Sequence, residues 1–464
     1  MSPSKDLALH RSVWYHEDMF APDQTKALVA RRGVPVLAAV IVLALGHTLV
    51  DFYGTTITPL LPRFQELWRL SSVSLGWLAA ATSLTGSLLQ PVLGLYLDKR
   101  GTSALAAAAV LWTGATVLLL DRLPSYAALF VLATVTILGS AVYHPLGAAL
   151  TLRVSPPGRR GFNMSLFMNI GTLGWAGAPF LVTWYVTAFG LRSLAWLIIP
   201  GLLEAVALGT LGLSLVRTST PLARSAGSAP PATPAPSAAP AGAASSGLPD
   251  LATAGPSPVP EPPLASREVR TRGVLFLLTA TILRSWVATG IQTYLPVYLV
   301  QQGHSLTFAG GALTTFMLSG TLAGFFIGWL SDRTERRTLY AGTLALAAAG
   351  LWWFLRAPAA WSPVASALTG AALLGSVPLT VVMIQEMHPH RTGTGSGLVI
   401  GFAGGLGGLL VLASGALADW LGLRAALAWL VPTLPLAALE ALAIPAAACR
   451  RPRRESQPAG ALAP

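Results

Sequence analysis

Twelve runs of apolar residues, each about as long as a membrane-spanning helix, dominate the sequence. A helix that crosses the hydrocarbon of a bilayer needs about 20 apolar residues, because each residue adds about 1.5 Å to its length. Only 10% of the residues are charged, whereas a soluble domain carries about 25%. The sequence therefore predicts an all-α integral membrane protein with spans near 36–61, 74–97, 104–120, 126–152, 161–188, 194–216, 274–300, 306–331, 339–355, 361–387, 393–419 and 425–447.

The apolar runs form two sets of six, and a stretch rich in Pro, Ala and Ser separates the sets. Such a composition cannot bury enough apolar surface to offset the entropy of ordering, so we expect a disordered linker there. The expected organisation is a tail at 1–33, a six-helix bundle at 34–216, the linker at 217–272, a second six-helix bundle at 273–448 and a tail at 449–464.

The two sets of spans resemble each other at matching positions. The string GLRSLAWL begins at residue 190, and GLRAALAWL begins at 422, an offset of 232. Asp98 and Asp332 follow the second and eighth spans at an offset of 234. The offsets predict two six-helix halves related by a parallel repeat, and such halves in transporters enclose a site near the midplane of the bilayer.

The distribution of positive charge indicates how the chain lies in the membrane. If both termini lie on one side, 23 of the 30 Lys and Arg residues fall on that side and six on the other. Short loops that stay in the cytoplasm carry an excess of Lys and Arg. Both termini are therefore predicted to be cytoplasmic, in a multi-pass protein of the inner (plasma) membrane. This topology accounts for the net charge of +12, and we expect no nucleic-acid partner.

His47 and Asp51 interrupt the first apolar run, one helical turn apart. A carboxylate at the centre of a bilayer costs about 2.5–3.5 kcal/mol, so Asp51 should face a wet cavity or a partner. Burial favours its neutral form, which allows the carboxyl to gain a proton on one side and lose it on the other. We predict that Asp51 carries the proton and that His47 passes it or shifts with it. The alternative is a structural hydrogen bond between helices.

Three further polar residues lie in or near the spans. Arg284 is the one basic residue well inside a span. We expect it to face Asp51 across a cavity or to bind an anionic substrate, because a guanidinium offers paired donors; snorkelling to the surface is the alternative. Glu386 and His144 lie near the cytoplasmic ends of the tenth and fourth spans, which predicts contacts at an inner gate, with a second proton site as the alternative.

Two loops carry a recognisable motif. The loop Gly94-x-x-x-Asp98-Lys-Arg100-Gly resembles the motif that the major facilitator superfamily places between its second and third spans, and the loop that starts at Gly328 resembles its copy. The resemblance implies the superfamily's fold of twelve helices in two halves, with gate contacts in which Asp98 caps the eleventh span and Asp332 the fifth. The gate residues that it implies are Gly94, Asp98, Arg100, Arg153, Gly328, Asp332, Arg333 and Arg336.

Four longer strings narrow the resemblance. GHTLVDFYGTTITPLLP, GSAVYHPLGAAL, SLLQPVLGLYLDK and IQEMHPHRTGTGSGLVIGFAGGLGG together resemble the fosmidomycin-resistance branch of that superfamily, whose members are proton-driven exporters. The residues that match include His47, Asp51, His144, Gln385 and Glu386. We therefore expect the substrate site to contain His144, Gln385 and Glu386, together with Arg284.

The fifth span contains NIGTLGWAGAPFL, which resembles a motif that antiporters of the superfamily carry in this helix. Its small residues Gly171, Gly174 and Gly177 allow helix backbones to approach closely, and Pro179 weakens the local backbone ladder. The resemblance favours antiport, and tight packing alone is the alternative interpretation.

The sequence contains no Gly-rich phosphate loop, no His-Glu-x-x-His and no Gly-x-Ser-x-Gly, so we expect no enzyme, no cofactor and no metal. An ion gradient must then supply the driving force. We predict a monomeric proton-coupled antiporter in the lipid bilayer that exports a small drug-like or anionic compound by alternating access. The alternatives are a proton symporter that imports a small organic solute and a transport-inactive membrane sensor or scaffold.

Overall fold

The computed structural model describes residues 36–100, 102–217, 267–388 and 392–449. Within these ranges all regular elements are helical, and twelve helical stretches are long and apolar enough to cross a membrane. The predicted all-α fold with twelve spans is therefore confirmed. The tail at 1–33, most of the expected linker and nearly all of the tail at 449–464 lie outside the described residues.

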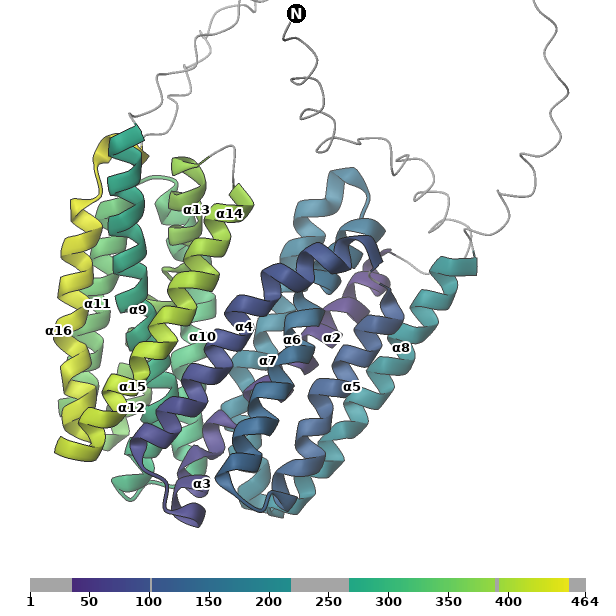
Figure 1. Ribbon diagram of the computed structural model, residues 1–464, viewed down its shortest axis with the longest axis horizontal. Coiled ribbons are helices and arrows are strands. Elements are labelled where there is room, and N and C mark those ends of the chain that lie inside the picture. The colour runs from purple at the N-terminus through teal and green to yellow at the C-terminus, as the bar shows by residue number, and fades with distance from the viewer. Residues whose placement is uncertain (1–35, 101, 218–266, 389–391, 450–464) are drawn as a thin grey trace, which may run out of the picture.

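The helices form two groups along the chain (Figure 1). The N-terminal helices are α2 (Val36–Thr55), α3 (Leu61–Trp68), α4 (Ser72–Arg100), α5 (Ser103–Leu119), α6 (Tyr126–Val154), α7 (Arg160–Phe189) and α8 (Ile198–Arg217). The C-terminal helices are α9 (Arg267–Gln301), α10 (Leu306–Ser331), α11 (Arg336–Arg356), α12 (Ser362–Leu374), α13 (Val377–Met387), α14 (Thr392–Ser396), α15 (Ala403–Leu421) and α16 (Leu423–Ala443).

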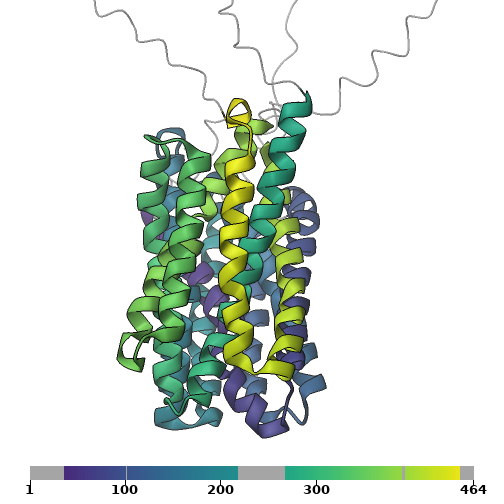
Figure 2. The same cartoon turned by 90° about the vertical axis from the view of Figure 1, so that its left-hand side faces the viewer.

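We call the end of the bundle where α8 ends and α9 begins the linker end, and the opposite end the far end. The two groups of helices converge at the far end and diverge toward the linker end (Figure 1). Contacts of α4 with α15 and of α7 with α10 join the groups. Figure 2 shows α9 and α16 side by side on the face of the C-terminal helices that is turned away from the N-terminal helices.

Three spans differ in detail from the sequence prediction. In the first, α2 ends at Thr55, and a short turn leads into α3, which begins at Leu61 and ends at Trp68. The tenth is not one helix but two, because the chain turns at Gly375 and Ser376 and Pro378 stands in the first turn of α13. The eleventh begins with α14 and one π-helical turn, Gly397–Phe402, before α15 continues it.

Small residues allow the central helices to lie close together. A Cβ atom at Gly408 of α15 would overlap the side chain of Ser83 of α4, and one at Gly407 would lie only 2.5 Å from Cβ of Ser285 of α9. These glycines therefore permit the close approach of α15 to both neighbours.

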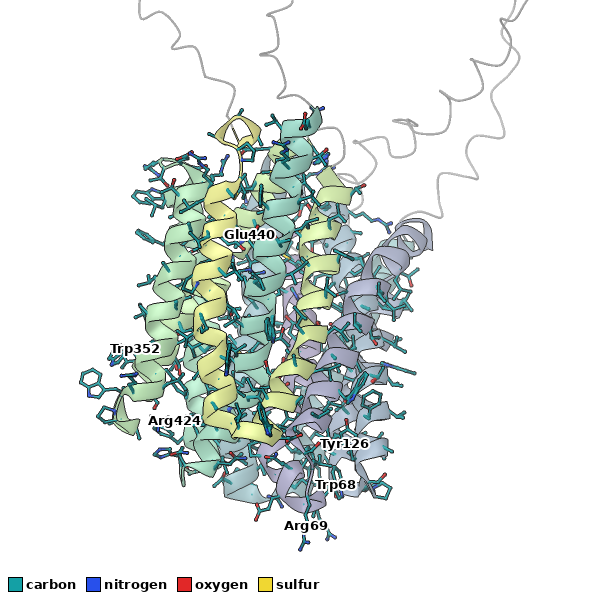
Figure 3. All side chains as sticks on the ribbon, turned by 60° about the vertical axis from the view of Figure 1, so that its left-hand side comes forward. Trp68, Arg69, Tyr126, Trp352, Arg424 and Glu440 are labelled. Atoms are coloured by element: carbon teal, nitrogen blue, oxygen red, sulfur yellow. The ribbon has the colours of Figure 1, made fainter. Side chains whose placement is uncertain are left out.

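The outer flanks of the bundle are apolar. Leu203, Val206, Phe326 and Leu439 each expose more than 60% of their surface, as residues that face lipid do. At the far end, aromatic and basic side chains gather, as they do at the boundary between a membrane and water. Figure 3 shows there Trp68, Arg69, Tyr126, Trp352 and Arg424.

Candidate functional site

Two histidines contact the carboxylate of Asp51 inside the N-terminal helices. Nε2 of His47, one turn earlier on α2, lies 3.4 Å from Asp51 Oδ2. Nε2 of His144, on α6, lies 3.1 Å from Asp51 Oδ1. We call these three residues the His–Asp–His cluster. The side chain of His47 is 1% exposed, that of Asp51 13% and that of His144 28%.

The packing of α6 on α2 places His144 beside Asp51. Tyr143 donates its hydroxyl proton to the carbonyl of Leu43 over 2.7 Å. Gly46 provides the space for the Tyr143 ring, because a Cβ atom at Gly46 would overlap that ring. The hydrogen bond and the missing side chain together fix the face of α6 that carries His144 against α2.

The packing of α7 on α2 forms the wall behind His47. A Cβ atom at Gly171 would overlap the His47 ring, and one at Gly174 would overlap the carbonyl of Thr48. Thr48 donates its hydroxyl proton to the carbonyl of Ile170 over 2.8 Å. The two glycines therefore pack closely against α2, and Gly171 makes room for the imidazole.

The second nitrogen of each imidazole contacts a backbone carbonyl. Nδ1 of His47 lies 3.2 Å from the carbonyl oxygen of Phe167. Nδ1 of His144 lies 2.7 Å from the carbonyl oxygen of Ser140. A carbonyl that holds one ring nitrogen sets the tautomer and the orientation of the ring. Both Nε2 atoms are thereby directed at Asp51.

A cavity of about 190 Å³ adjoins the cluster and lies between the two groups of helices. Its wall includes Asp51, Ser140 and Trp175 from the N-terminal helices and Gln292 and Met317 from the C-terminal helices. A cavity of about 400 Å³ shares the residues Ile137 and Ser140 with it. The wall of this larger cavity also contains hydroxyls and glycines of α4 and of the start of the eleventh span, namely Thr82, Ser83, Ser87, Ser396, Gly397 and Gly401.

Hydrogen bonds between the two groups of helices close the far end. Asp419, in the last turn of α15, accepts the backbone N–H of Ser72 over 2.6 Å and that of Val73 over 3.0 Å, both in the first turn of α4. Tyr294 donates to the carbonyl of Ser72 over 3.0 Å. Further along this end, the hydroxyls of Thr307 and Thr187 lie 3.1 Å apart.

Arg284 was expected to face Asp51 across a cavity or to bind an anionic substrate, and it does not line either of the two cavities described above. It is 6% exposed and packs inside the C-terminal helices, where its guanidinium lies 3.2 Å from Ser285 Oγ and 3.5 Å from the carbonyl of Leu373. Among the described residues, the ion-pair partners of Asp51 are His47 and His144.

Glu386 and His144 are not brought together either. Glu386 on α13 forms an ion pair with Arg336 at the start of α11, and both side chains are mostly buried. Gln385 donates to Ser396 Oγ over 2.9 Å, which ties α13 to α14. Of the four residues expected to bind substrate, His144 belongs to the His–Asp–His cluster, and Gln385 reaches the cavity wall through Ser396.

The gate residues of the second motif lie at the linker end. Asp332 is 67% exposed and lies 3.8 Å from the guanidinium of Arg336. Arg333 stacks on the ring of Trp329 at 4.0 Å, and no atom of another residue would crowd a side chain at Gly328. Arg153 lies in the last turn of α6. In the first motif, the side chains of Gly94, Asp98 and Arg100 lie outside the described residues.

The second half of the glycine motif in α7 is packed less tightly. The nearest atom to a Cβ at Gly177 would be Cδ1 of Leu181, 3.8 Å away and in the same helix. Pro179 lies where α7 meets α10, because a Cβ at Gly310 would overlap the Pro179 carbonyl. The close contact between the two groups of helices at this place thus depends on Gly310, which the sequence analysis did not identify.

Trp175 and Gln292 in the cavity wall and Asp419 at the far end were not predicted from the sequence. Three features of the sequence could have indicated them. They are an aromatic ring and an amide inside apolar spans, and an acid at the far end of the eleventh span. Among the described residues, His47, Asp51 and His144 form the one group whose ligand atoms, all within 4.8 Å of one another, have the types and spacing to hold a metal ion.

Comparisons with known proteins cover most of the chain. The family model of the Major Facilitator Superfamily matches residues 43–411 and 301–463. The fosmidomycin resistance protein of Escherichia coli (strain K12) is 26% identical over 394 residues, which cover 84% of this chain and 88% of that protein. The uncharacterized MFS-type transporter YfnC of Bacillus subtilis (strain 168) is 25% identical over 402 residues, which cover 85% of this chain and 90% of that protein.

Solved structures share the fold. The peptide transporter POT in complex with sulfate superposes with a TM-score of 0.66 at 15% sequence identity. The superposition covers 92% of this chain and 98% of that transporter.

Proposed function

Since the chain belongs to the major facilitator superfamily of membrane transporters, we propose that it exports a small molecule in exchange for protons. The observation that carries this proposal is the position of the His–Asp–His cluster. Asp51 and Ser140, the residue that holds His144, line a cavity between the two groups of helices. Protons and cargo thus meet at one place in the interior.

Coupling follows from the chemistry of this cluster. A carboxylate and two imidazoles change charge by gaining or losing protons in the physiological range or after modest perturbation by their neighbours. A cargo molecule that enters the cavity beside Asp51 changes the polar environment of the cluster. Binding of cargo and release of protons then favour each other, which is the linkage that an antiporter requires.

The arrangement of the two groups of helices supports alternating access. Their hydrogen bonds close the far end, and the cavities lie between that closure and the linker end. We propose that the linker end faces the cytoplasm of the cell, because Arg153, Arg333, Arg336 and Arg337 concentrate positive charge there. Cargo would load from the cytoplasm in this conformation, and the far end would open for release.

The proton gradient supplies sufficient energy for export. One proton that moves down about 100 mV yields about 2.3 kcal/mol. A tenfold concentration gradient of a neutral solute costs about 1.4 kcal/mol, so one proton sustains a gradient of about 40-fold. The E. coli relative is named for resistance to fosmidomycin, and we propose a drug-like compound of this kind as the cargo.

Everted membrane vesicles with an acid interior test the proposal. Addition of fosmidomycin should discharge the pH gradient, and vesicles with Asp51→Asn should not respond. The matched control is Asp121→Asn, which changes an acid at the far end that lies beside Arg122 and does not line the two cavities. Full proton exchange in Asp51→Asn vesicles would refute the role of Asp51. If cargo and protons instead entered the vesicles together, the protein would be a symporter and not an antiporter.

A further inference from the structure

We propose that the C-terminal helices bind an anionic phospholipid at the far end, in a cavity between α11 and α16. The phosphate of the headgroup contacts Arg356 and Arg424, and an acyl chain lies along the apolar wall beside them. The site is separate from the two cavities near the His–Asp–His cluster. It goes beyond the proposed function, because the lipid binds whether or not the protein transports cargo.

The cavity has a charged end and an apolar wall. Its volume is about 320 Å³, and it lies where the end of α11 packs beside the beginning of α16. Arg356 is the last residue of α11, and Arg424 stands in the first turn of α16. The other residues that line the cavity are apolar or aromatic, namely Trp352, Leu355, Ala428, Val431 and Pro432. The apolar wall therefore continues from the two arginines along α16 for about two turns, toward the middle of the span.

Both guanidinium groups are held in place and keep donors for a ligand. The guanidinium carbon of Arg356 lies 4.7 Å from the centre of the Trp352 ring. Nη2 of Arg424 donates to the backbone carbonyl of Leu355 over 3.1 Å. Stacking on a ring uses no N–H group, and the bond of Arg424 uses one of its five. The remaining donors suit the oxygens of a phosphate, which a guanidinium binds in pairs.

No acid neutralises this pair of arginines within the part of the chain that the structure describes. The helix α11 contains no Asp or Glu. The acid of α16 is Glu440, sixteen residues after Arg424 and so about 24 Å further along the helix. Asp419, near the end of α15, accepts two backbone N–H groups of α4. The two positive charges are thus available to an anion from outside the chain.

The N-terminal helices contain a corresponding pair of arginines. Arg122 precedes Arg356 by 234 residues, and Arg192 precedes Arg424 by 232 residues, which are the offsets of the internal repeat. The two short helical turns that contain Arg122 and Arg192 contact each other. The N-terminal pair is therefore a natural comparison for the C-terminal one.

One residue distinguishes the two pairs. Asp121 stands beside Arg122, and its carboxylate lies 4.0 Å from the guanidinium Nε. The corresponding position in the C-terminal half is Leu355, which offers no charge. The C-terminal pair consequently has one more net positive charge than its counterpart. This difference favours an external anion at the C-terminal pair and not at the N-terminal pair.

The surroundings of the cavity favour a lipid over a soluble anion. Trp352 exposes 50% of its surface, Trp429 60% and Leu436 50%, as side chains that face lipid do. Figure 3 shows Trp352 and Arg424 near the far end, where aromatic and basic side chains mark the boundary of the membrane. A phospholipid places its phosphate at this boundary and its acyl chains against the apolar flank. A zwitterionic headgroup would also bring a positive charge toward the arginines, so an anionic lipid fits better.

Native mass spectrometry of the full-length protein in detergent tests the proposal. The probe is phosphatidylglycerol, compared with phosphatidylcholine that has the same acyl chains. The test variant is Arg356→Gln with Arg424→Gln, and the matched control is Arg122→Gln with Arg192→Gln. We expect the test variant to bind phosphatidylglycerol about 30-fold more weakly than the wild type, since an arginine near the membrane surface contributes about fivefold. The control should bind it like the wild type, and phosphatidylcholine should bind weakly to all three proteins.

Several outcomes would overturn the proposal. One is equal affinity of the wild type and the test variant for phosphatidylglycerol, and another is equal affinity of the wild type for the two lipids. Glycerol 3-phosphate, which is a soluble part of the headgroup, should not displace the lipid. If it displaced the lipid at a similar concentration, the cavity would be a site for small anions and not for a lipid.

Melting temperatures separate loss of the site from loss of the fold. Both arginine side chains are exposed, so the test variant should melt like the wild type in phosphatidylcholine. Phosphatidylglycerol should raise the melting temperature of the wild type and of the control, and leave that of the test variant unchanged. The single variant Arg356→Gln keeps the bond of Arg424 to Leu355 and should bind phosphatidylglycerol about fivefold more weakly. Unchanged binding in this folded single variant would also contradict the proposal.

Discussion

Replacement of Asp419 by alanine should shift the protein toward a conformation that is open at the far end. The Asp419 carboxylate accepts two backbone N–H groups from the first turn of α4. Those groups have no acceptor inside the helix, and the positive end of the helix dipole favours a carboxylate there. Because Asp419 lies on α15, the contact joins the two groups of helices, and it must break when the far end opens.

The size of the shift follows from the cost of a lost helix cap. Loss of a capping side chain costs about 1 kcal/mol, within a range of about 0.5–2 kcal/mol. Asp419 is exposed, so the middle of that range applies. The whole cost falls on the conformation that is closed at the far end, and about 1 kcal/mol changes the ratio of the two conformations about fivefold. Asparagine also caps helices well, so Asp419→Asn should shift the ratio less.

Distances between spin labels across the far end measure this ratio. Labels at Arg69→Cys and Gln302→Cys, in a background in which Cys449 is serine, lie on the two groups of helices. The ratio of the longer to the shorter distance should rise about fivefold in Asp419→Ala. It should not change in Asp121→Ala, which removes an acid that pairs within the N-terminal helices. An unchanged distance distribution in Asp419→Ala would refute the idea that this cap holds the far end closed.

Two further substitutions test local features. Gly171→Ala should abolish proton-coupled transport while the protein still folds, because the new methyl displaces the His47 ring; Gly177→Ala, with no close neighbour in another helix, should transport normally in the same vesicle assay. At the linker end, hydrogen bonds from Thr338 and a neighbouring arginine hold the pKa of Glu335 below its ordinary value. The resulting stability is complete at neutral pH and is lost as the pH falls through that lowered pKa. The difference in melting temperature between wild type and Glu335→Gln should therefore vanish in acid, and a constant difference would contradict the assignment.

The number and order of the spans were predictable because the thickness of the bilayer fixes the length of each apolar run. The environment of Asp51 was predictable in part. His47 lies on the same helix at a fixed spacing, so its contact follows from helix geometry alone. His144 lies 93 residues further along the chain, and its contact depends on how α6 is rotated against α2. The hydrogen bond of Tyr143 and the gap at Gly46 set that rotation, and no local pattern encodes it.

The placement of Arg284 and Glu386 shows the same limit. Both are charged residues in apolar spans, and the cost of burying charge predicts that each needs a partner. It does not predict which partner. Arg336, which pairs with Glu386, stands in a loop motif at the start of α11 and was interpreted as a gate residue. Arg284 turns into the C-terminal helices toward Ser285. Which side of a helix faces the cavity depends on packing across both groups.

The π-helical turn at Gly397–Phe402 inserts one additional residue into the eleventh span. One residue of an α-helix corresponds to a rotation of about 100°, so the insertion turns every side chain before it by that angle relative to α15. Ser396 owes its direction to this rotation, and with it both its bond to Gln385 and its place in the cavity wall. A chain shortened by one residue within 397–402 would have the same composition of polar groups, yet a different set of them would line the cavity.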